Sequence, residues 1–262
     1  MDSLRASIQS VLAQSRKPDR FVVIDNASTD ESRQIAGEMG VEVVDADNRY
    51  KFITGLNTAL GLNSDLLFFM QNDVTLAPDC LSEMLRHSPR YTNFIAQPVI
   101  YQTDDEIDNA GMDIVWPGYG IRRNRRWWNG EYSFLECGLV TTICFLTNNR
   151  TTLYDEAFSP AYYEDLDMKL RTPHYKHVIV PGASATHLGN HTFSQTLKKP
   201  EISKLCRKNR KIFIRKHYKG VGGALRLAVT TCLDIVKETF DVIARWRSAH
   251  YNGQQVTIGN LS

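Results

Sequence analysis

The sequence predicts an α/β fold, in which a mixed and mainly parallel sheet is flanked by helices and followed by a C-terminal helical extension. Three observations lead to this prediction. Short apolar runs alternate with helical patterns over residues 2–70, and each run ends at a polar residue, as buried parallel strands do. The chain has 262 residues, 42% of them hydrophobic, which is enough to bury one full core. Beyond residue 191 the composition becomes basic and helical.

The first half of the chain shows the clearest alternation of elements. Leu4, Ile8, Val11 and Leu12 share one helical face, so we expect an opening helix that ends at Pro18. The elements that follow are expected in this order: a strand at 21–24, a helix between Asp30 and Gly40, a strand at 41–44, a helix over 53–60 and a strand at 66–70. Units of this size are typical of an open sheet with flanking helices.

The second half is less regular. The expected elements are a helix at 81–85, a strand at 94–100, an irregular stretch rich in Gly, Trp and Arg, a strand at 139–146, a helix at 163–170, strands at 177–180 and 183–187, a basic helix at 204–216 and an amphipathic helix at 225–246. We assign residues 1–200 to the α/β domain, residues 201–250 to a helical extension that packs on this domain or on a partner, and residues 251–262 to a tail.

Composition narrows the classes of partner and compartment. The net charge of +2 gives no general attraction to nucleic acid, and we expect no nucleic-acid partner. The five cysteines form no C-x-x-C pair, which favours reduced thiols. The sequence has no apolar stretch long enough to cross a membrane and no basic-then-apolar leader. We therefore expect a cytoplasmic protein that is soluble or peripheral to the inner face of the membrane.

Polar side chains follow several of the expected strands directly. In parallel α/β sheets, ligands bind beyond the carboxyl ends of the strands, so these positions are the first candidates for a functional site. The candidates are Asp25, Asn26, Ser28 and Asp30 after the first strand, Gln71, Asn72 and Asp73 after the 66–70 strand, His187 after the last strand, and Glu164, Asp165 and Asp167 at the start of a helix.

Each group also has a purely structural interpretation. Asp25 to Asp30 suit a polar turn with a helix cap, and Asp73 suits a turn. The acidic residues at 164–167 suit a solvated first helical turn, where negative charge complements the helix dipole. A single histidine is usually a satisfied structural residue. The order and position of the groups carry more information than any one of them.

Several segments, taken together, resemble a known family. They are 22–32 (V-V-I-D-N-A-S-T-D-E-S), 55–60 (G-L-N-T-A-L), 69–74 (F-M-Q-N-D-V), 155–158 (D-E-A-F), 163–171 (Y-E-D-L-D-M-K-L-R), 181–187 (P-G-A-S-A-T-H), 207–210 (R-K-N-R) and 216–218 (K-H-Y). In this order they resemble the family 2 inverting glycosyltransferases of the GT-A fold, and in particular the rhamnosyltransferase-like branch. The resemblance covers residues 2–218.

The resemblance implies an activity and a set of roles. It implies a metal-dependent transferase that moves a sugar from a UDP- or dTDP-linked donor to a hydroxyl of a glycan or lipid-linked acceptor, with inversion, as in polysaccharide and cell-wall biosynthesis. Asp73 and His187 would hold Mn²⁺ or Mg²⁺, for which carboxylate oxygen is a suitable hard ligand. Asp25, Asn26, Ser28, Asp30 and Asn57 would bind the nucleotide. Asp165 would be the general base, assisted by Glu164, and Asp167 would hold acceptor hydroxyls.

The sequence departs from the family pattern at three places. The family's first strand and its Asn/Thr-Tyr-Asn turn precede the first helix, whereas here Met1 to Leu4 already align with the start of that helix. Gln71 replaces the first ligand of the metal motif, and Leu153-Tyr154 replace two glycines. These departures favour a second hypothesis from another class, in which the chain is a non-catalytic GT-A-like module that binds a glycan or a protein.

Two further segments remain open to more than one interpretation. Trp127 and Trp128, beside a run of arginines, would suit an acceptor loop by stacking on sugar rings, or equally a solvated turn with partly buried tryptophans. The amphipathic helix at 225–246 could contact a membrane surface, but acidic residues on its polar face favour packing on its own domain or in a homo-oligomer.

Overall fold

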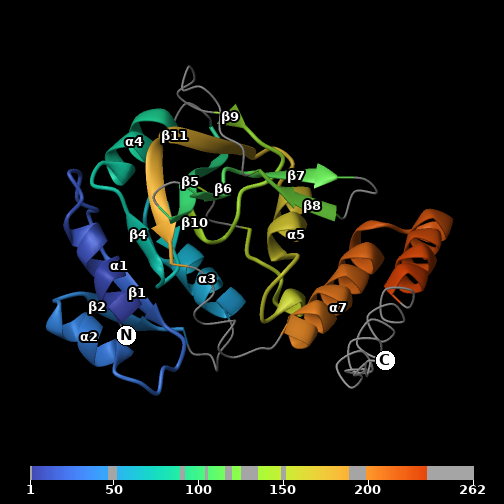
Figure 1. Ribbon diagram of the computed structural model, residues 1–262, viewed down its shortest axis with the longest axis horizontal. Helices are drawn as coiled ribbons and strands as arrows, with labels where there is room; N and C mark the ends of the chain where they lie inside the picture. The colour runs from blue at the N-terminus through green and yellow to red at the C-terminus, as the bar shows by residue number, and fades with distance from the viewer. Residues whose placement is uncertain are drawn as a thin grey trace, which may run out of the picture. The chain divides into compact units, whose positions relative to one another are not determined.

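The computed structural model describes residues 2–46, 52–88, 92–103, 106–115, 120–124, 135–148, 152–188 and 199–234. The chain divides into two compact units, Met1–Asn209 and Arg210–Ser262. The first unit is an α/β domain, and the described part of the second is helical. The predicted class, a mixed α/β sheet flanked by helices with C-terminal helices after it, is confirmed (Figure 1).

The N-terminal elements form a small layer of their own. β1 (Val22–Asp25) and β2 (Glu42–Asp45) pair in parallel, and α2 (Ser32–Glu38) connects them. α1 (Asp2–Leu12) packs on α2, and both helices bury their apolar faces in one cluster. That cluster consists of Leu4, Ile8, Ile35, Ala36 and Val41, with Phe21, Val23, Met39 and Val43 at its edge. The predicted opening helix and both predicted strands are therefore present.

The main sheet has seven strands. Its order is β3 (Leu67–Met70), β10 (Cys144–Thr147), β5 (Phe94–Thr103), β11 (Lys176–His187) and β4 (Val74–Leu76), with β6 (Glu106–Asn109) paired to β5 and β9 (Leu135–Glu136) paired to β11. β5 and β11 pair in parallel, while β10 and β4 run opposite to their neighbours. β3, β5 and β11 therefore point the same way, and their carboxyl ends share one edge.

The core of this sheet lies where α4 (Cys80–His87) packs on β5 and β11. Phe94, Ile100 and Met84 are each at most 1% exposed, and Phe145 on β10 stacks on Phe69 of β3. Figure 1 shows β11 as a long curved strand with α4 against its first half. This packing fixes the end of β11, and with it His187.

β1 and β3 do not pair with each other, and α3 (Phe52–Gly61) packs on both. Ile53 and Leu56 are completely buried in this helix, as the predicted helix over 53–60 requires. Within the described residues, each of the two strands therefore has one edge without a partner strand.

Two parts of the prediction were wrong in detail. The stretch after β5 was predicted to be irregular, but it contains β6 and a hairpin of β7 (Met112–Val115) and β8 (Gly120–Arg123). The strands predicted at 177–180 and 183–187 are one strand, β11, whose register shifts between Val180 and Ser184. Pro181 and Gly182 suggested a break, and the bulge accommodates them without one.

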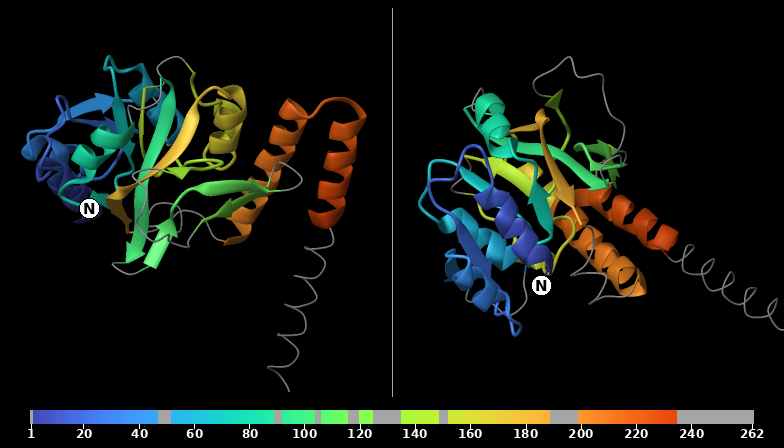
Figure 2. Two further views of the ribbon diagram at one scale, coloured as in Figure 1. Left: turned by 90° about the horizontal axis from the view of Figure 1, so that it is seen from above. Right: turned by 60° about the vertical axis from the view of Figure 1, so that its left-hand side comes forward.

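The C-terminal helices begin with α7 (Lys199–His217), and residues 220–234 form a further helix. The two run antiparallel side by side, since Arg210 pairs with Asp234 and Arg226 lies over the Tyr218 ring, 4.5 Å from its centroid (Figure 2). Among the described residues, none of the helices is both long and apolar enough to span a bilayer. All five cysteines lie in the described part of the chain and are free thiols.

Candidate active site

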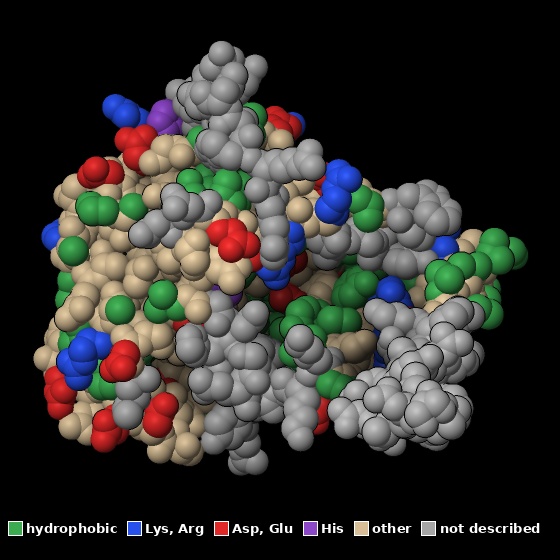
Figure 3. Space-filling model, viewed as in Figure 1, with side chains coloured by type: hydrophobic (Ala, Val, Ile, Leu, Met, Phe, Trp, Pro, Cys, Tyr) green, Lys and Arg blue, Asp and Glu red, His purple; other side chains and the backbone are tan. Residues whose placement is uncertain are grey.

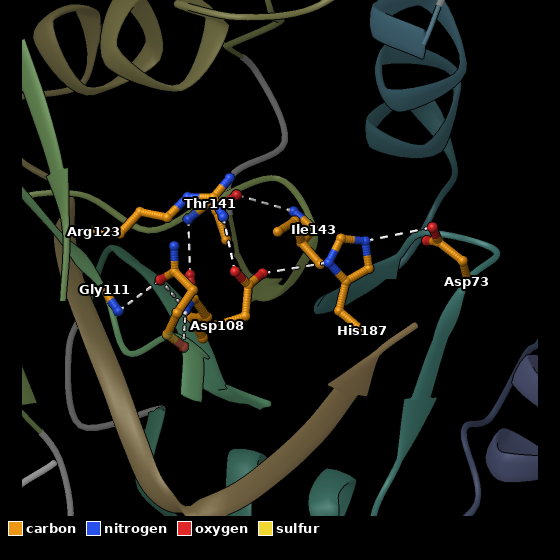
Figure 4. Close-up of polar contacts among 9 residues, drawn as sticks. Asp73, Asp108, Gly111, Arg123, Thr141, Ile143 and His187 are labelled. Carbon is orange, nitrogen blue, oxygen red and sulfur yellow. Dashed lines mark hydrogen bonds and ion pairs between the residues drawn. The ribbon is translucent and has the colours of Figure 1, made fainter. Parts of the chain in front are cut away.

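His187 lies between two carboxylates (Figure 4). It is the last residue of β11, where it pairs with Val74, the residue that follows Asp73. Its Nε2 is 3.4 Å from Asp73 Oδ2, and its Nδ1 is 3.4 Å from Asp108 Oδ2. Register alone therefore brings the two predicted metal ligands, Asp73 and His187, to the same place.

Asp108 and Arg123 complete a chain of charges that the sequence did not predict. Arg123 Nη1 donates to Asp108 Oδ1 at 2.8 Å, so Asp108 joins the guanidinium to the His187 ring. Asp108 is on β6 and Arg123 on β8, both in the stretch that was expected to be irregular. The sequence offered one signal for this site, the polar pair Asp108-Asn109 directly after the apolar Ile107. Because no strand was predicted at 106–109, nothing in the sequence placed this pair beside the other strand ends.

The two carboxylates determine the charge of His187. Burial alone would lower the pKa of this imidazole, but Asp108 and Asp73 outweigh the effect of burial and raise the pKa to about 9. Without a cation, His187 is therefore protonated at neutral pH and pairs with both acids; a cation bound at its Nε2 would take the place of that proton. An imidazole whose Nδ1 is held by a carboxylate also presents its Nε2 in a fixed direction, here toward Asp73.

The Asp73–His187 pair fits a divalent cation. Asp73 is 5% exposed, and its Oδ1 is buried without a hydrogen-bond partner in the structure, which is costly for a carboxylate oxygen unless a ligand fills the position. Within the described residues no group of three or more His, Cys, Asp or Glu side chains converges on one point. Two protein ligands match the way Mg²⁺ is often held, by one or two carboxylates together with substrate phosphates.

Glu164 and Asp165 form a second acidic pair at the start of α5 (Glu164–Arg171). Thr142 Oγ1 donates to Glu164 Oε1 at 3.4 Å, and the proximity of Thr142 to Asp165 favours the ionised form of the Asp165 carboxylate. Burial raises the pKa of Glu164 to about 7, and burial together with the charge of Glu164 raises the pKa of Asp165 well above its ordinary value. At neutral pH the pair therefore holds protons that isolated carboxylates would release.

The turn at residues 141–143 connects the acidic pair to the Asp73–His187 pair. Ile143 O accepts from Gln71 N at 2.9 Å, two residues before Asp73, while Thr142 contacts Glu164 and Asp165. Arg123 pairs with Asp108, and its charge also lowers the pKa of Asp165, so this one guanidinium acts on both pairs. Figure 3 shows a hollow in this face where acidic, basic and histidine side chains gather beside hydrophobic ones. The two pairs therefore belong to one site.

A buried amide network supports the walls of this site. Gln97 on β5 is 0% exposed; its Nε2 donates to Asn109 Oδ1 at 2.9 Å, and its Oε1 accepts from Thr141 N at 2.8 Å. Asn109 Oδ1 also accepts from Gly111 N at 2.8 Å. Gln97 thereby joins Asn109, the residue after Asp108, to Thr141, the residue before Thr142.

Asn209 of α7 holds the turn that leads into α5. It is completely buried, and its Nδ2 donates to the carbonyls of Phe158, Ala161 and Tyr162 at 2.7, 2.9 and 3.0 Å. Tyr162 and Tyr163, with φ of 77° and 75°, are in the left-handed region that side chains other than glycine rarely adopt. Such strain is found at functional sites where the surroundings enforce it, and here it directly precedes Glu164.

The predicted nucleotide-binding turn follows β1. Asp25 accepts from Ser28 N at 3.2 Å and from Arg33 Nη1 at 2.8 Å. Burial raises the pKa of Asp25, but these two partners outweigh it and leave the pKa below its ordinary value, so Asp25 is ionised. Asp30 Oδ1 accepts from the backbone N–H of Ser32, the first residue of α2, at 3.0 Å. No hydrogen bond or ion pair of the described residues connects this turn to Asp73.

Asn26 lies against α3. Its Oδ1 is buried without a hydrogen-bond partner, and a Cβ added at Gly55 would lie 2.8 Å from its Nδ2. The absence of a side chain at Gly55 therefore leaves the space that the Asn26 amide fills. A buried amide oxygen without a partner at a strand end is suited to accept from a ligand.

Two other predicted ligand-binding residues, Asn57 and Asp167, make hydrogen bonds within the chain. Asn57 binds the backbone of Tyr154 with both groups of its amide, at 2.9 and 2.8 Å, which attaches α3 to the chain before α5. Asp167 is 0% exposed and accepts from Arg171 Nε at 2.7 Å, while Arg171 also donates to Leu153 O. These two side chains are occupied in holding the fold. Trp127 and Trp128 lie outside the described residues.

Comparison with protein families identifies this arrangement. The profile described as Glycosyl transferase family 2 matches residues 2–145, more than half of the chain. The chain belongs to glycosyl transferase family 2. No curated protein sequence matches it. The matched part of this family 2 chain contains Asp25, Asp73, Asp108 and Thr142, whereas Glu164, Asp165 and His187 lie beyond it.

Two solved structures share the fold of this family 2 chain. A structure of GalNAc-T7 with UDP, GalNAc and Mn²⁺ matches with a TM-score of 0.57 at 16% identity, over 77% of this chain and 44% of that one. A structure of S. aureus TarS 1–349 in complex with UDP-GlcNAc matches with a TM-score of 0.51 at 13% identity, over 87% of this chain and 65% of that one. The chain thus spans less than two thirds of either protein, and the likeness shows the shared GT-A fold.

A substitution at Gly55 tests the packing of Asn26. We expect Gly55→Ala to lower the free energy of unfolding by ~1–3 kcal/mol, because the new methyl group overlaps the Asn26 amide. Gly61→Ala, in the same helix but with no atom within 4 Å of the added Cβ, should be neutral or stabilising by up to ~1 kcal/mol. Urea unfolding measures both. Equal effects of the two substitutions would contradict the close contact.

The raised pKa of Glu164 predicts a stability that depends on pH. The folded pKa is about 7 against an ordinary 4.5, so the folded state binds this proton more tightly. Its contribution is complete below the ordinary pKa and is lost as pH rises through the folded value. Glu164→Gln should therefore gain on the order of 1–3 kcal/mol relative to the wild type between about pH 5 and about pH 8. Exposed Glu31→Gln should show no such gain in urea unfolding, and a flat difference for both would refute the shift.

Proposed function

We propose that this chain transfers a sugar from a nucleoside-diphosphate sugar to a hydroxyl group of a glycan or lipid-linked acceptor, with inversion at the anomeric carbon. The observation that carries the proposal is the proximity of two different pairs of side chains in one hollow. One is the carboxylate–histidine pair Asp73 and His187, and the other is the acidic pair Glu164 and Asp165. The first suits a cation and a diphosphate, and the second suits proton transfer. Membership in family 2 and the fold shared with UDP-bound structures support this assignment.

The donor is held by two parts of the site in this proposal. Asp25, with the nearby Asn26, Ser28 and Asp30, binds the base and ribose at the end of β1, where ionised Asp25 accepts hydrogen bonds. Asp73 and His187 would hold a divalent cation, Mn²⁺ or Mg²⁺. When bound, such a cation neutralises the charge that develops on the leaving diphosphate. Asp108 and Arg123 keep the His187 ring in place.

Asp165 is proposed as the general base. It is half-buried, whereas Glu164 is 5% exposed and directed to Thr142, so Asp165 is the more accessible of the two to an acceptor hydroxyl. The raised pKa of Asp165 makes it a stronger base once ionised, and the charge of Arg123 limits that rise. The charge of Glu164 contributes to that rise. The acceptor oxygen then attacks the anomeric carbon from the face opposite the diphosphate, and one displacement inverts the configuration.

The remaining assignments follow the family resemblance. UDP and dTDP donors both suit the Asp25 turn, and a dTDP-rhamnose donor follows from the rhamnosyltransferase-like branch. We assign the transferase to residues 1–200, with residues 201–250 as a helical extension. The structural roles of Asn57 and Asp167 favour leaving these two residues out of ligand binding.

Donor consumption by Asp165→Asn tests the proposal. We expect the wild type with Mn²⁺ to release UDP or dTDP from at least one donor in a panel of nucleotide sugars and simple glycoside acceptors. Asp165→Asn should lower kcat roughly 10²–10⁴-fold while the donor Kd stays within about twofold, because the base acts in the transition state. Asp65→Asn, in a loop before β3, is the control with unchanged kcat. A folded wild type that consumes no donor would instead favour the non-catalytic binding module.

A further inference from the structure

The helix at residues 220–234 exposes a stripe of apolar side chains. Val221, Leu225, Val229 and Leu233 are 86%, 63%, 43% and 62% exposed, and they follow one another at intervals of four residues. Residues four apart lie on the same face of a helix, so the four side chains form one continuous stripe. Figure 3 shows hydrophobic side chains gathered on the outer surface of these C-terminal helices. Ala224, Ala228 and Cys232 are also exposed, and none of these seven residues carries a charge.

The stripe is not the face by which this helix packs on α7. The packed face contains Gly223 and Thr230, both buried, with Arg226 over the Tyr218 ring and Asp234 paired to Arg210. A Cβ added at Gly223 would overlap the carbonyl of Tyr218 in the connection that leads into this helix, so the first turn packs closely on that connection. The helix therefore has one face that is satisfied by its neighbour and a second apolar face in contact with water.

The charge of this helix pair is strongly one-sided. Over residues 199–234, which hold both helices, ten residues are basic and two, Glu201 and Asp234, are acidic; Glu238 and Asp241 follow later in the sequence. Asp234 is partly buried and engaged by Arg210, so it does not offset the exposed cations. Lys211 and Arg215 lie four residues apart on one face of α7, and Lys219 follows in the connection between the two helices, where its Nζ donates to Arg215 O at 3.0 Å.

We propose that the helix at residues 220–234 docks on the surface of an anionic lipid bilayer. Its apolar stripe would enter the boundary between headgroups and acyl chains, as interfacial helices do. Packed helices lie about 8–10 Å apart, so Lys211 and Arg215 of α7 lie within roughly one Debye length of the headgroups that this helix touches. A bilayer of acidic lipids satisfies the apolar stripe and the excess of positive charge together.

Other partners for this helix would match either its apolar stripe or its positive charge, but not both. A second copy would cover the stripe, but a symmetric contact would bring two strongly basic helix pairs together. Nucleic acid would match the charge and leave the apolar stripe in water. This inference stands apart from the proposed transferase activity, since it uses no residue of the Asp73 or Glu164 clusters.

Vesicle co-sedimentation of the full chain tests the proposal. We expect binding to phosphatidylcholine vesicles that contain phosphatidylglycerol, and little binding to phosphatidylcholine alone. The double variant Leu225→Asn/Leu233→Asn should lose binding at least about tenfold, because two exposed leucines no longer enter the bilayer. Lys211→Gln/Lys219→Gln should lose roughly fivefold per residue and become less sensitive to salt. The matched control is Leu12→Asn/Leu153→Asn, which removes two exposed leucines from the first unit and should bind like the wild type.

Each contrary result overturns the proposal. Failure of the folded wild type to bind acidic vesicles would do so, as would equal binding by Leu225→Asn/Leu233→Asn. Light scattering after size-exclusion chromatography addresses the second copy: a wild-type dimer that the leucine variant converts to a monomer would assign the stripe to self-association. Circular dichroism of each variant verifies the helix content. Donor consumption measured on the same samples separates this outcome from that of the transferase proposal.

Discussion

The row of charges from buried Asp73 through His187 and Asp108 to half-exposed Arg123 constrains the rest of this structure. Charged groups removed from water are costly unless each meets a partner, and here each side chain is the partner of the next. Removing one member of the row would leave its neighbour without this charged partner. Asp73 is its terminal member, and one of its carboxylate oxygens is buried without a hydrogen-bond partner. That oxygen marks the point where a ligand completes the arrangement.

The fold brings four distant segments to this row. β11 delivers His187 by pairing with β4, β6 delivers Asp108 by pairing with β5, and the β7–β8 hairpin delivers Arg123. Gln97 then connects the Asp108 side to the Thr141–Thr142 turn, so that Glu164 and Asp165 are set against the same frame. Asn209 fixes the turn before them. The geometry of both acidic pairs therefore depends on buried amides rather than on exposed ion pairs, which contribute little.

Much of the fold could be predicted from the sequence, because strands such as β1, β3 and β5 are apolar runs that end at polar residues. The β6–β8 region could not, since Asp108 and Asn109 are buried polar residues whose partners are distant in sequence. The candidate site divides in the same way. Asp73 and His187 follow strands, and position alone suggested them. Asn57 and Asp167 are as polar as Asp73 and His187, but in the structure they bind Tyr154 and Arg171. Hydropathy does not distinguish a polar side chain that holds the fold from one that is available to a ligand.

The most direct test of this account is calorimetric binding of UDP with Mn²⁺ to the wild type and to Asp108→Asn, with dTDP measured in parallel. The account predicts binding that EDTA abolishes, and a loss of about 10–100-fold in Asp108→Asn, because the His187 ring is no longer held toward Asp73. Asp113→Asn, which removes an exposed ion pair with Arg122 in the neighbouring hairpin, should bind as the wild type does. Nucleotide binding that persists in EDTA, or equal affinities of Asp108→Asn and Asp113→Asn, would contradict the account.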